Sequence, residues 1–484
     1  MNARTTAPPL TALLLLSAIV AGGPAVRDLP PSEAGFEPYL RFTPSSMAGR
    51  VDWLLVTTAE LAPAFEPLVR HRRDLGLVCE VVTVEEVTRD ALLGGGDFPE
   101  RLRNFVRYLS GSHGLRYLLL GADSELLPAR LAPFPIRGEN VHYGEPYAVE
   151  GYFGCLDGEW NADADARIGE AEPGDDDRPD LAARVHVGRV PAEDVREVEA
   201  FVSKVLLYER PMHLEYLDRA VFLGGKVFIE GDADQHYREL FAKHFEPAGF
   251  RADFFTVEGG PTEVIRALSE GAGIVSHYHH SFTYNLSLPN GAIDTGNVGE
   301  IANAERPCLF FSNGCYSNQF TKEGISEKML LSPAGGAAAF VGSTNTCFTT
   351  SLGLERRFWD HLFTGSARTL GEALSAMRAE VTTGVGPLGF LRLSFALLGD
   401  PATPPWLARP VRVELSVTAG KDGALTVRRK GAAPGRVIAA CVQEGPYGAF
   451  RETIPFPEGA EEVVFPPVVG NGAPLRVTLS GDRV

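Results

Sequence analysis

The sequence is short of positive charge. Among its 484 residues, 45 Lys and Arg stand against 62 Asp and Glu, which gives a formal net charge of -17. A surface this acidic repels phosphate backbones and anionic lipids. We therefore expect no nucleic-acid partner and no binding to a membrane surface.

Cysteine is also scarce. The six cysteines lie at 79, 155, 308, 315, 347 and 441. They form no CxxC pair and no zinc-binding spacing, which argues against a disulfide scaffold and a structural zinc site. Some of them could pair in an exported protein. We expect Cys79 and Cys308, which lie in apolar runs, to be core residues.

Long apolar runs are missing except near the start of the chain. The run Leu10–Ala21 follows a single cation, Arg4, and precedes two glycines and a proline. It is shorter than the roughly 20 residues needed to span a bilayer. This pattern is typical of a secretory signal peptide. We predict a signal peptide over 1–25, a lead segment over 26–50, and no membrane span in the mature chain. The protein is then exported, to be secreted, periplasmic or on the cell surface.

From residue 51 the pattern alternates short apolar strands with amphipathic helices, which predicts parallel sheets covered by helices on both faces. The pattern runs through two α/β subdomains, residues 51–210 and 211–408. Helices are expected over 352–364, 369–381 and 388–398. Residues 409–484 instead alternate apolar and polar residues, with turn signals about every ten residues, which predicts a small Ig-like β-sandwich.

Two strand ends in the second subdomain carry reactive side chains. The strand AGIVSHY (272–278) leads into His279 and His280, and the strand CLFFSN (308–313) leads into Gly314 and Cys315. If these strands are parallel neighbours, His280 and Cys315 emerge side by side at one sheet edge. An imidazole there can act as the base for a thiol nucleophile.

The surrounding turn residues could serve the same chemistry. Backbone N–H groups of Cys315 and Ser281 would lie where an oxyanion forms, with Gly314 and His279 as their neighbours. Two alternatives remain open. His277 and His279 share one face of an extended segment and could bind a metal, although no third ligand is evident. All three histidines could instead be structural.

These segments resemble those of gingipain-type cysteine peptidases, relatives of caspases and legumains. IVSHYHHSFTYN is similar to the family's GxxxVNYxGHGS strand and places His280 on the catalytic histidine. SNGCYSNQF is similar to SxGCxxGxF and places Cys315 on the nucleophile. Further matches, in family order over about 51–406, are YFGCLDGEWNADAD, VHVGRVPAEDVREVEAFVSKVLLYE, GGAAAFVGSTN and SFALLGDPATP.

The resemblance implies a caspase-like fold and a cysteine endopeptidase that cleaves protein or peptide substrates through a thioester, with no cofactor needed for the chemistry. Two other functions stay open: a sortase-like transpeptidase acting on cell-surface proteins, and an inactive, peptidase-like binding protein. The sequence departs from the family at two positions. His279 replaces a glycine, and Gly225 stands where the family has an acid that orients the histidine. Glu230 or Asp232 could substitute for that acid, or Cys315 and His280 act as a dyad.

The resemblance also suggests two ligand sites. Related enzymes bind a basic P1 side chain with an acid, for which Asp232 and Asp234 are the candidates. Asn161, Asp163 and Asp165 resemble the family's DxDxDG loops and could hold a structural calcium ion, whose preferred ligands are oxygens. The alternative is a solvated acidic loop.

Overall fold

The structure is a computed structural model. It describes residues 49–90, 93–133, 146–165, 167–169, 177–228, 231–380, 387–410, 414–420, 424–430, 437–445, 448–457, 460–466 and 475–481. These residues form two compact units: an α/β unit with most of the residues up to 410, and a C-terminal β unit. The predicted signal peptide, and the lead segment up to residue 48, lie outside the described residues.

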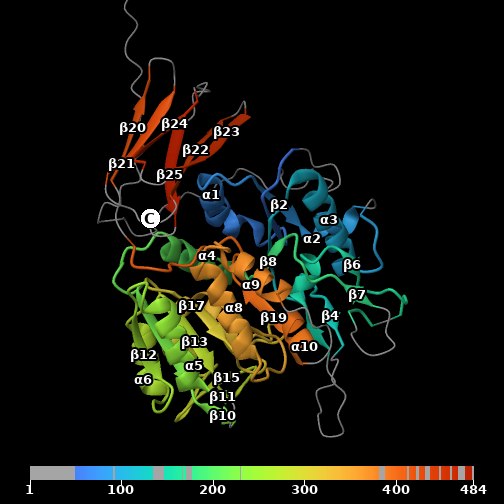
Figure 1. The fold of residues 1–484 in the computed structure, drawn as a ribbon. Helices are drawn as coiled ribbons and strands as arrows, with labels where there is room; N and C mark the ends of the chain where they lie inside the picture. Colours follow the sequence, from blue (N-terminus) through green and yellow to red (C-terminus); the bar gives the residue numbers. More distant parts are fainter. Residues whose placement is uncertain are drawn as a thin grey trace, which may run out of the picture. The chain divides into compact units, whose positions relative to one another are not determined.

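The α/β unit is built on one ten-stranded sheet (Figure 1). In spatial order its strands are β12 (Arg251–Phe255), β9 (Arg219–Gly224), β13 (Ile274–Tyr278), β17 (Cys308–Ser312), β18 (Ala337–Ser343), β19 (Phe395–Leu398), β8 (His186–Arg189), β3 (Tyr117–Gly121), β1 (Trp53–Thr57) and β2 (Cys79–Thr83). Strand pairs within this sheet are parallel except β18 with β19, which are antiparallel. The mostly parallel α/β fold predicted from the sequence is confirmed.

The central strands are apolar because both faces of the sheet are covered. Every residue of β1, β3, β13, β17, β18 and β19 is buried. Side chains on both sides of such a strand must be removed from water, so its sequence is a continuous apolar run without alternation. Cys79 and Cys308 lie in this core, as expected, and all six cysteines are free.

Helices flank this sheet (Figure 1). They are α1 (Glu66–Asp74), α2 (Val84–Arg89), α3 (Phe98–His113), α4 (Val195–Glu209), α5 (Ala233–Leu240), α6 (Pro261–Ser269), α7 (Ile325–Leu331), α8 (Ser351–Phe363), α9 (Leu370–Ala379) and α10 (Pro387–Ser394). Side chains of Asp97, Asp194 and Thr369 accept the backbone N–H three residues on, at the starts of α3, α4 and α9. Such caps satisfy N–H groups that have no partner within the helix, which fixes where each helix begins.

One predicted helix is partly wrong. The helix expected over 388–398 ends at Ser394 in α10, and Phe395–Leu398 form β19. This strand joins the two predicted subdomains, because it pairs with β18 on one side and with β8 through Leu398 and Arg189 on the other. A four-residue apolar run is compatible with either structure, and here the free edge of β18 selects the strand.

The α/β unit also contains short sheets in its loops. β14 (Ser281–Phe282), β15 (Asn285–Leu288) and β16 (Gly291–Asp294) form an antiparallel sheet directly after β13. The other short strands are β4 (Leu131–Ala132), β5 (Tyr147–Ala148), β6 (Gly158–Glu159), β7 (Arg178–Pro179), β10 (Lys226–Phe228) and β11 (Gly231–Asp232). The sequence analysis did not predict the sheet of β14 to β16, which holds the chain directly after the candidate histidines.

The C-terminal unit contains two antiparallel sheets. One is formed by β20 (Glu414–Ala419), β21 (Leu425–Lys430) and β24 (Glu462–Phe465), and the other by β23 (Gly448–Pro455), β22 (Val437–Gly445) and β25 (Leu475–Gly481). Buried side chains from both sheets, such as Val427 and Phe465 from one and Ala439 and Cys441 from the other, pack into one core. This is the layering of a sandwich. Its assignment as Ig-like stays a prediction.

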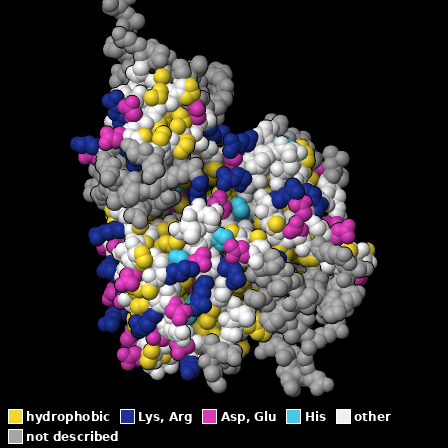
Figure 2. All heavy atoms as spheres, viewed as in Figure 1, with side chains coloured by type: hydrophobic (Ala, Val, Ile, Leu, Met, Phe, Trp, Pro, Cys, Tyr) yellow, Lys and Arg dark blue, Asp and Glu magenta, His cyan; other side chains and the backbone are white. Residues whose placement is uncertain are grey.

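The acidic charge is spread over the surface. On the face drawn in Figure 2, Lys and Arg side chains of the α/β unit lie among Asp and Glu rather than apart from them. Within the described part of the chain, none of the helices has the length and apolar content needed to cross a bilayer.

Candidate active site

The strands that carry the candidate dyad are parallel neighbours, as the sequence analysis required. β13 and β17 pair from Ile274 and Leu309 to His277 and Ser312. The pairing continues past the strands, since the backbone N–H of Asn313 donates to the His277 carbonyl at 2.8 Å. His280 and Cys315 each lie three residues beyond the last pair. Equal distances from a shared register place both residues at the same edge of the sheet.

The two turns that follow the strands are in direct contact. The Ser281 hydroxyl donates to the Cys315 carbonyl at 2.7 Å. Gly314 lies between them, and a Cβ atom built there would fall 2.0 Å from the Ser281 hydroxyl oxygen. Only glycine allows this close approach of the nucleophile turn to the histidine turn. Ser281 is buried and Cys315 is half-buried.

The sulfur of Cys315 lies against the loop after β18. It accepts the backbone N–H of Cys347 at 3.3 Å, and its thiol points to the Cys347 carbonyl at 3.5 Å. Burial raises the pKa of the Cys315 thiol, and backbone hydrogen bonds from Cys347 and from Cys315 itself oppose that rise. The thiol is therefore held in its protonated form, and a base is needed to make it nucleophilic.

Tyr278 adds a hydroxyl to this site. Burial, together with smaller contributions from the neighbouring thiols of Cys347 and Cys315, raises its pKa to about 12. Its hydroxyl is buried and has no hydrogen-bond partner within the described residues. The sequence analysis identified neither Tyr278 nor Cys347. In the sequence, Tyr278 is simply the last residue of an apolar strand. The only signal for Cys347 was its position after the AAAFVGS strand.

His277 is a structural histidine. It is fully buried, with Nδ1 at 3.0 Å from the Ser312 hydroxyl and Nε2 at 2.9 Å from the Ser287 carbonyl. Burial lowers its pKa to about 4, so the ring is neutral. Because both ring nitrogens are engaged, His277 has no lone pair left for a metal. The described residues also contain no group of three or more His, Cys, Asp or Glu that could hold a metal ion.

His279 and His280 have different surroundings. His280 is exposed, and its backbone N–H donates to Nδ1 of His279 at 2.7 Å. The His279 ring lies over Gly225, where an added Cβ would fall 2.6 Å from Cδ2 and 2.7 Å from Nε2. Burial lowers the pKa of His279. The two departures from the family pattern are thus spatially linked, because the side chain at 279 fills the space that a side chain at 225 would need.

Of the other three acids considered near this edge, Asp232 and Asp234 are engaged by groups on α5. Glu230 lies outside the described residues. Asp232 caps α5 by accepting the N–H groups of Asp234 and Gln235. The Asp234 carboxylate pairs with Arg238 at 2.7 Å, and that hydrogen bond is the main cause that lowers its pKa. Of the two candidates for the P1 pocket, Asp234 is the less available to a substrate cation, because its carboxylate is already paired with Arg238.

The acidic loop is organised by its own hydrogen bonds. Asp163 and Asp165 each accept a backbone N–H two residues on, and the Asn161 amide donates to the Asp165 carbonyl at 3.0 Å. Ala164 has φ +57°, so the loop turns through the left-handed region without a glycine. As arranged, these groups serve the turn, so the loop would have to rearrange to bind calcium. The calcium hypothesis stays a prediction.

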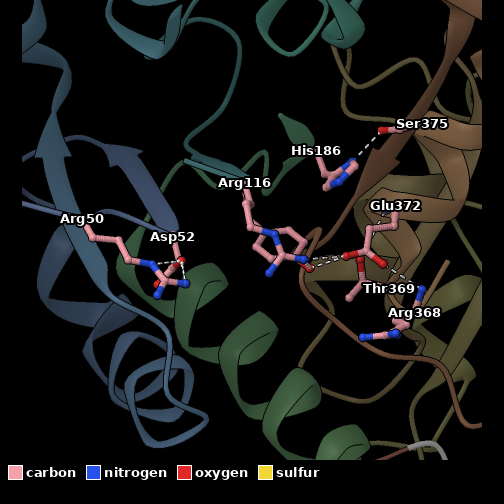
Figure 3. A network of polar contacts seen from close by, with 9 residues as sticks. Arg50, Asp52, Arg116, His186, Arg368, Thr369, Glu372 and Ser375 are labelled. Carbon is pink, nitrogen blue, oxygen red and sulfur yellow. Dashed lines mark hydrogen bonds and ion pairs between the residues drawn. The ribbon is translucent and has the colours of Figure 1, made fainter. Parts of the chain in front are cut away.

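A separate cavity of about 490 Å³ lies at the starts of β3 and β8. In Figure 3, Arg116 and His186 point toward α9, where Glu372 accepts Arg116 at 3.0 Å and Ser375 meets Nδ1 of His186 at 2.9 Å. Neither Cys315 nor His280 lines this cavity. It contains no cysteine, and burial lowers the pKa of His186 to about 4, so we do not assign it the thiol chemistry.

Comparison with known proteins identifies the family. The model of peptidase family C25 matches residues 46–406. An uncharacterized protein of Archaeoglobus fulgidus is 22% identical over 341 residues, which are 60% of this chain and 75% of that protein. The crystal structure of the Arg-specific cysteine proteinase gingipain R has a TM-score of 0.68 at 15% identity, covering 91% of this chain and 97% of that one. A complex of the pro- and mature domains of RgpB from Porphyromonas gingivalis has a TM-score of 0.67 at 15% identity, covering 89% and 97%.

The family match spans most of the chain, and the solved structures share its α/β fold. The resemblance predicted from the motifs is confirmed: the chain belongs to peptidase family C25 and is a cysteine peptidase.

Proposed function

We propose that this peptidase is an exported endopeptidase that works through a dyad of Cys315 and His280. The observation that carries the proposal is the register of β13 and β17, which leaves both residues three positions past the last strand pair. The hydrogen bond from Ser281 to the Cys315 carbonyl supports it, because the two turns are then fixed to each other.

The raised pKa of Cys315 defines the task of His280. A thiol that burial keeps protonated attacks slowly unless a base removes its proton. His280 is exposed and so accessible to solvent and substrate. Histidine is the side chain that serves most often as a general base in enzymes. We assign the proton transfer from Cys315 to His280.

The reaction then proceeds in two steps. The Cys315 sulfur attacks the scissile carbonyl carbon, and the C–N bond breaks as His280 gives its proton to the leaving amine. The product is a thioester on Cys315. Water attacks the thioester and passes a proton to His280, which returns it to the sulfur as the carboxylic acid leaves. Backbone N–H groups at Cys315 and Ser281 are the proposed oxyanion donors.

Export rests on the sequence alone, through the signal peptide predicted over 1–25. Expression of the full chain in a bacterial host, with fractionation and N-terminal sequencing of the mature protein, tests it. A product that keeps residues 1–25 and stays in the cytoplasm would contradict export and leave the chemistry untouched.

The chemistry is tested at the nucleophile. Cys315→Ala should abolish peptide hydrolysis and labelling by an iodoacetamide probe, with the melting temperature kept within a few degrees. Cys347→Ala is the matched control, because it removes the neighbouring thiol and keeps the backbone N–H that meets the Cys315 sulfur. Hydrolysis that persists in Cys315→Ala would remove Cys315 from the mechanism.

A further inference from the structure

A buried carboxylate lies beneath the strand ends that carry the dyad. Glu355 belongs to α8 and its side chain is fully buried. It accepts hydrogen bonds from the Ser276 hydroxyl, from Nδ2 of Asn313 at 2.7 Å and from Nε1 of Trp359 at 3.2 Å. Nε2 of His236, on α5, lies 2.9 Å from the same carboxylate. Figure 1 shows α5 and α8 beside β13 and β17.

The burial of this carboxylate needs an explanation. Removing an ionised carboxyl group from water costs several kcal/mol, and an apolar side chain of similar volume would often give a more stable core. A fully satisfied polar network instead fixes one arrangement of the groups around it. The Glu355 carboxylate itself meets this condition, because each of its oxygens accepts more than one hydrogen bond. Among its partners, Oδ1 of Asn313 and Nδ1 of His236 are buried without a hydrogen-bond partner in the described part of the chain.

Two of the hydrogen-bond partners of Glu355 lie a few residues before the reacting residues in the sequence. Ser276 lies on β13, four residues before His280, and Asn313 directly follows β17, two residues before Cys315. Oε1 of Glu355 holds Ser276 and Oε2 holds Asn313. The Glu355 carboxylate therefore connects the two strands that lead to His280 and Cys315.

We propose that Glu355 is a positioning residue that sets the placement of Cys315 relative to His280. It acts through Asn313 and Ser276 and does not touch substrate. The proposal rests on the dyad proposed above. The carboxylate also holds His236 and Trp359 from the helices that cover this face of the sheet, so that the strand ends are fixed against a rigid layer.

The first test replaces the carboxylate by its amide. Glu355→Gln keeps the shape and loses the acceptor that faces Asn313. Misplacing a catalytic group by about 1 Å can cost about 100-fold in rate, so we expect kcat to fall by about that factor while KM changes little. The rate of iodoacetamide labelling at Cys315 should fall in parallel, and its pH profile should shift toward that of an isolated thiol.

A rescue separates positioning from a general loss of structure. Asn313→Asp alone sets two carboxylates against each other and should lower kcat similarly. In the double variant Glu355→Gln/Asn313→Asp, the Gln amide donates to the Asp carboxylate and its carbonyl still accepts Ser276 and Trp359. The hydrogen bond returns with reversed polarity, and kcat should recover at least tenfold over either single variant. If Glu355→Gln alone does not fold, Asn313→Asp and the double variant carry the test.

Trp406→Phe is the stability control. It removes a hydrogen bond of 2.9 Å from a buried indole to the Tyr208 carbonyl, away from the Glu355 network. It should lower the melting temperature and leave kcat unchanged. A similar fall in kcat for Trp406→Phe and Glu355→Gln would overturn the positioning role, as would a double variant that regains its melting temperature but not its kcat. Wild-type kcat in Glu355→Gln, with Cys315→Ala inactive, would overturn this proposal alone. Full activity in Cys315→Ala would instead overturn the dyad.

Discussion

His279 shows at the scale of one residue how two substitutions compensate. Its ring fills the space over Gly225, the position at which the family resemblance places an acid. An acid at 225 and a large side chain at 279 cannot both be accommodated without moving the ring. In this chain the imidazole at 279 accepts the His280 backbone N–H. Fixing the backbone of the base is a different way to hold it from accepting a proton on its ring.

The two neighbouring histidines can be told apart by mutation. His280→Ala should remove measurable hydrolysis, because the protonated Cys315 thiol then has no base. His279→Gly removes the acceptor of the His280 backbone N–H but restores the glycine found in the family pattern. It should keep most of the activity, because the hydrogen bond from Ser281 to the Cys315 carbonyl still joins the two turns. Peptide hydrolysis by both variants is the measurement. An inactive His279→Ala beside an active His280→Ala would show that the alignment is off by one residue.

The P1 preference also depends on single residues. We predict that this peptidase prefers Arg or Lys at P1 if Asp232 faces the substrate, because its carboxylate would then pair with the P1 cation. One oxygen of Asp232 caps α5, whereas Asp234 is paired with Arg238. Asp232→Asn should therefore reduce cleavage after basic residues by about 10-fold or more, since an unpaired buried cation costs several kcal/mol.

Profiling against a peptide library varied at P1 measures this preference. Asp234→Asn is the matched control and should keep the wild-type profile. A wild-type preference for apolar or acidic P1 residues would remove both aspartates from the substrate site.

At the scale of an element, the acidic loop after β6 is where a ligand would change the structure most. Asp163 and Asp165 are exposed, and their side chains accept only N–H groups within the loop among the described residues. If calcium binds there, the loop must rearrange, and binding to the folded state alone raises the melting temperature by mass action.

Thermal unfolding measured in about 1 mM calcium, and again in the presence of a chelator, tests this hypothesis. We expect a higher melting temperature with calcium in the wild type and no calcium effect in Asp163→Ala/Asp165→Ala. Identical unfolding of the wild type under both conditions would leave the solvated acidic loop as the better description.

At the scale of the whole molecule, one buried acid couples stability to pH. Burial, together with smaller contributions from the carboxylates of Asp123 and Glu197, raises the pKa of Glu327 to about 9. Its ordinary value is 4.5. Between these values the folded state binds a proton that the unfolded state has lost, so stability falls as pH rises. The contribution is complete below about pH 4.5 and is lost through about pH 9.

Glu327→Gln mimics the protonated acid at every pH. We expect the variant and the wild type to unfold at similar temperatures at pH 5, and the variant to be more stable at pH 9. Calorimetry across this range measures the difference. Parallel pH dependence of the two proteins would show that Glu327 is ionised in the folded state.

Elements with strong local signals could be predicted from the sequence alone. Apolar runs such as 308–313 and 337–343 predicted buried strands, because a strand covered on both faces must be apolar throughout. Those strands, their helices and the Gly314–Cys315 and His280 positions after them could be located without coordinates. The family resemblance depended on the same segments, and the match over 46–406 confirmed it.

Which residues contact one another at the active site could be seen only in the folded structure. Phe395–Leu398 became a strand because β18 offered a free edge, and no local pattern carries that information. Tyr278, Cys347 and Glu355 reach Cys315 or its strand from positions far along the chain, so their spacing in the sequence gives no signal. The place of His279 over Gly225 likewise depends on β9 and β13 pairing side by side. Contacts between distant segments form only when the sheet assembles, and this is why chemistry-bearing residues could be named from the sequence while their partners could not.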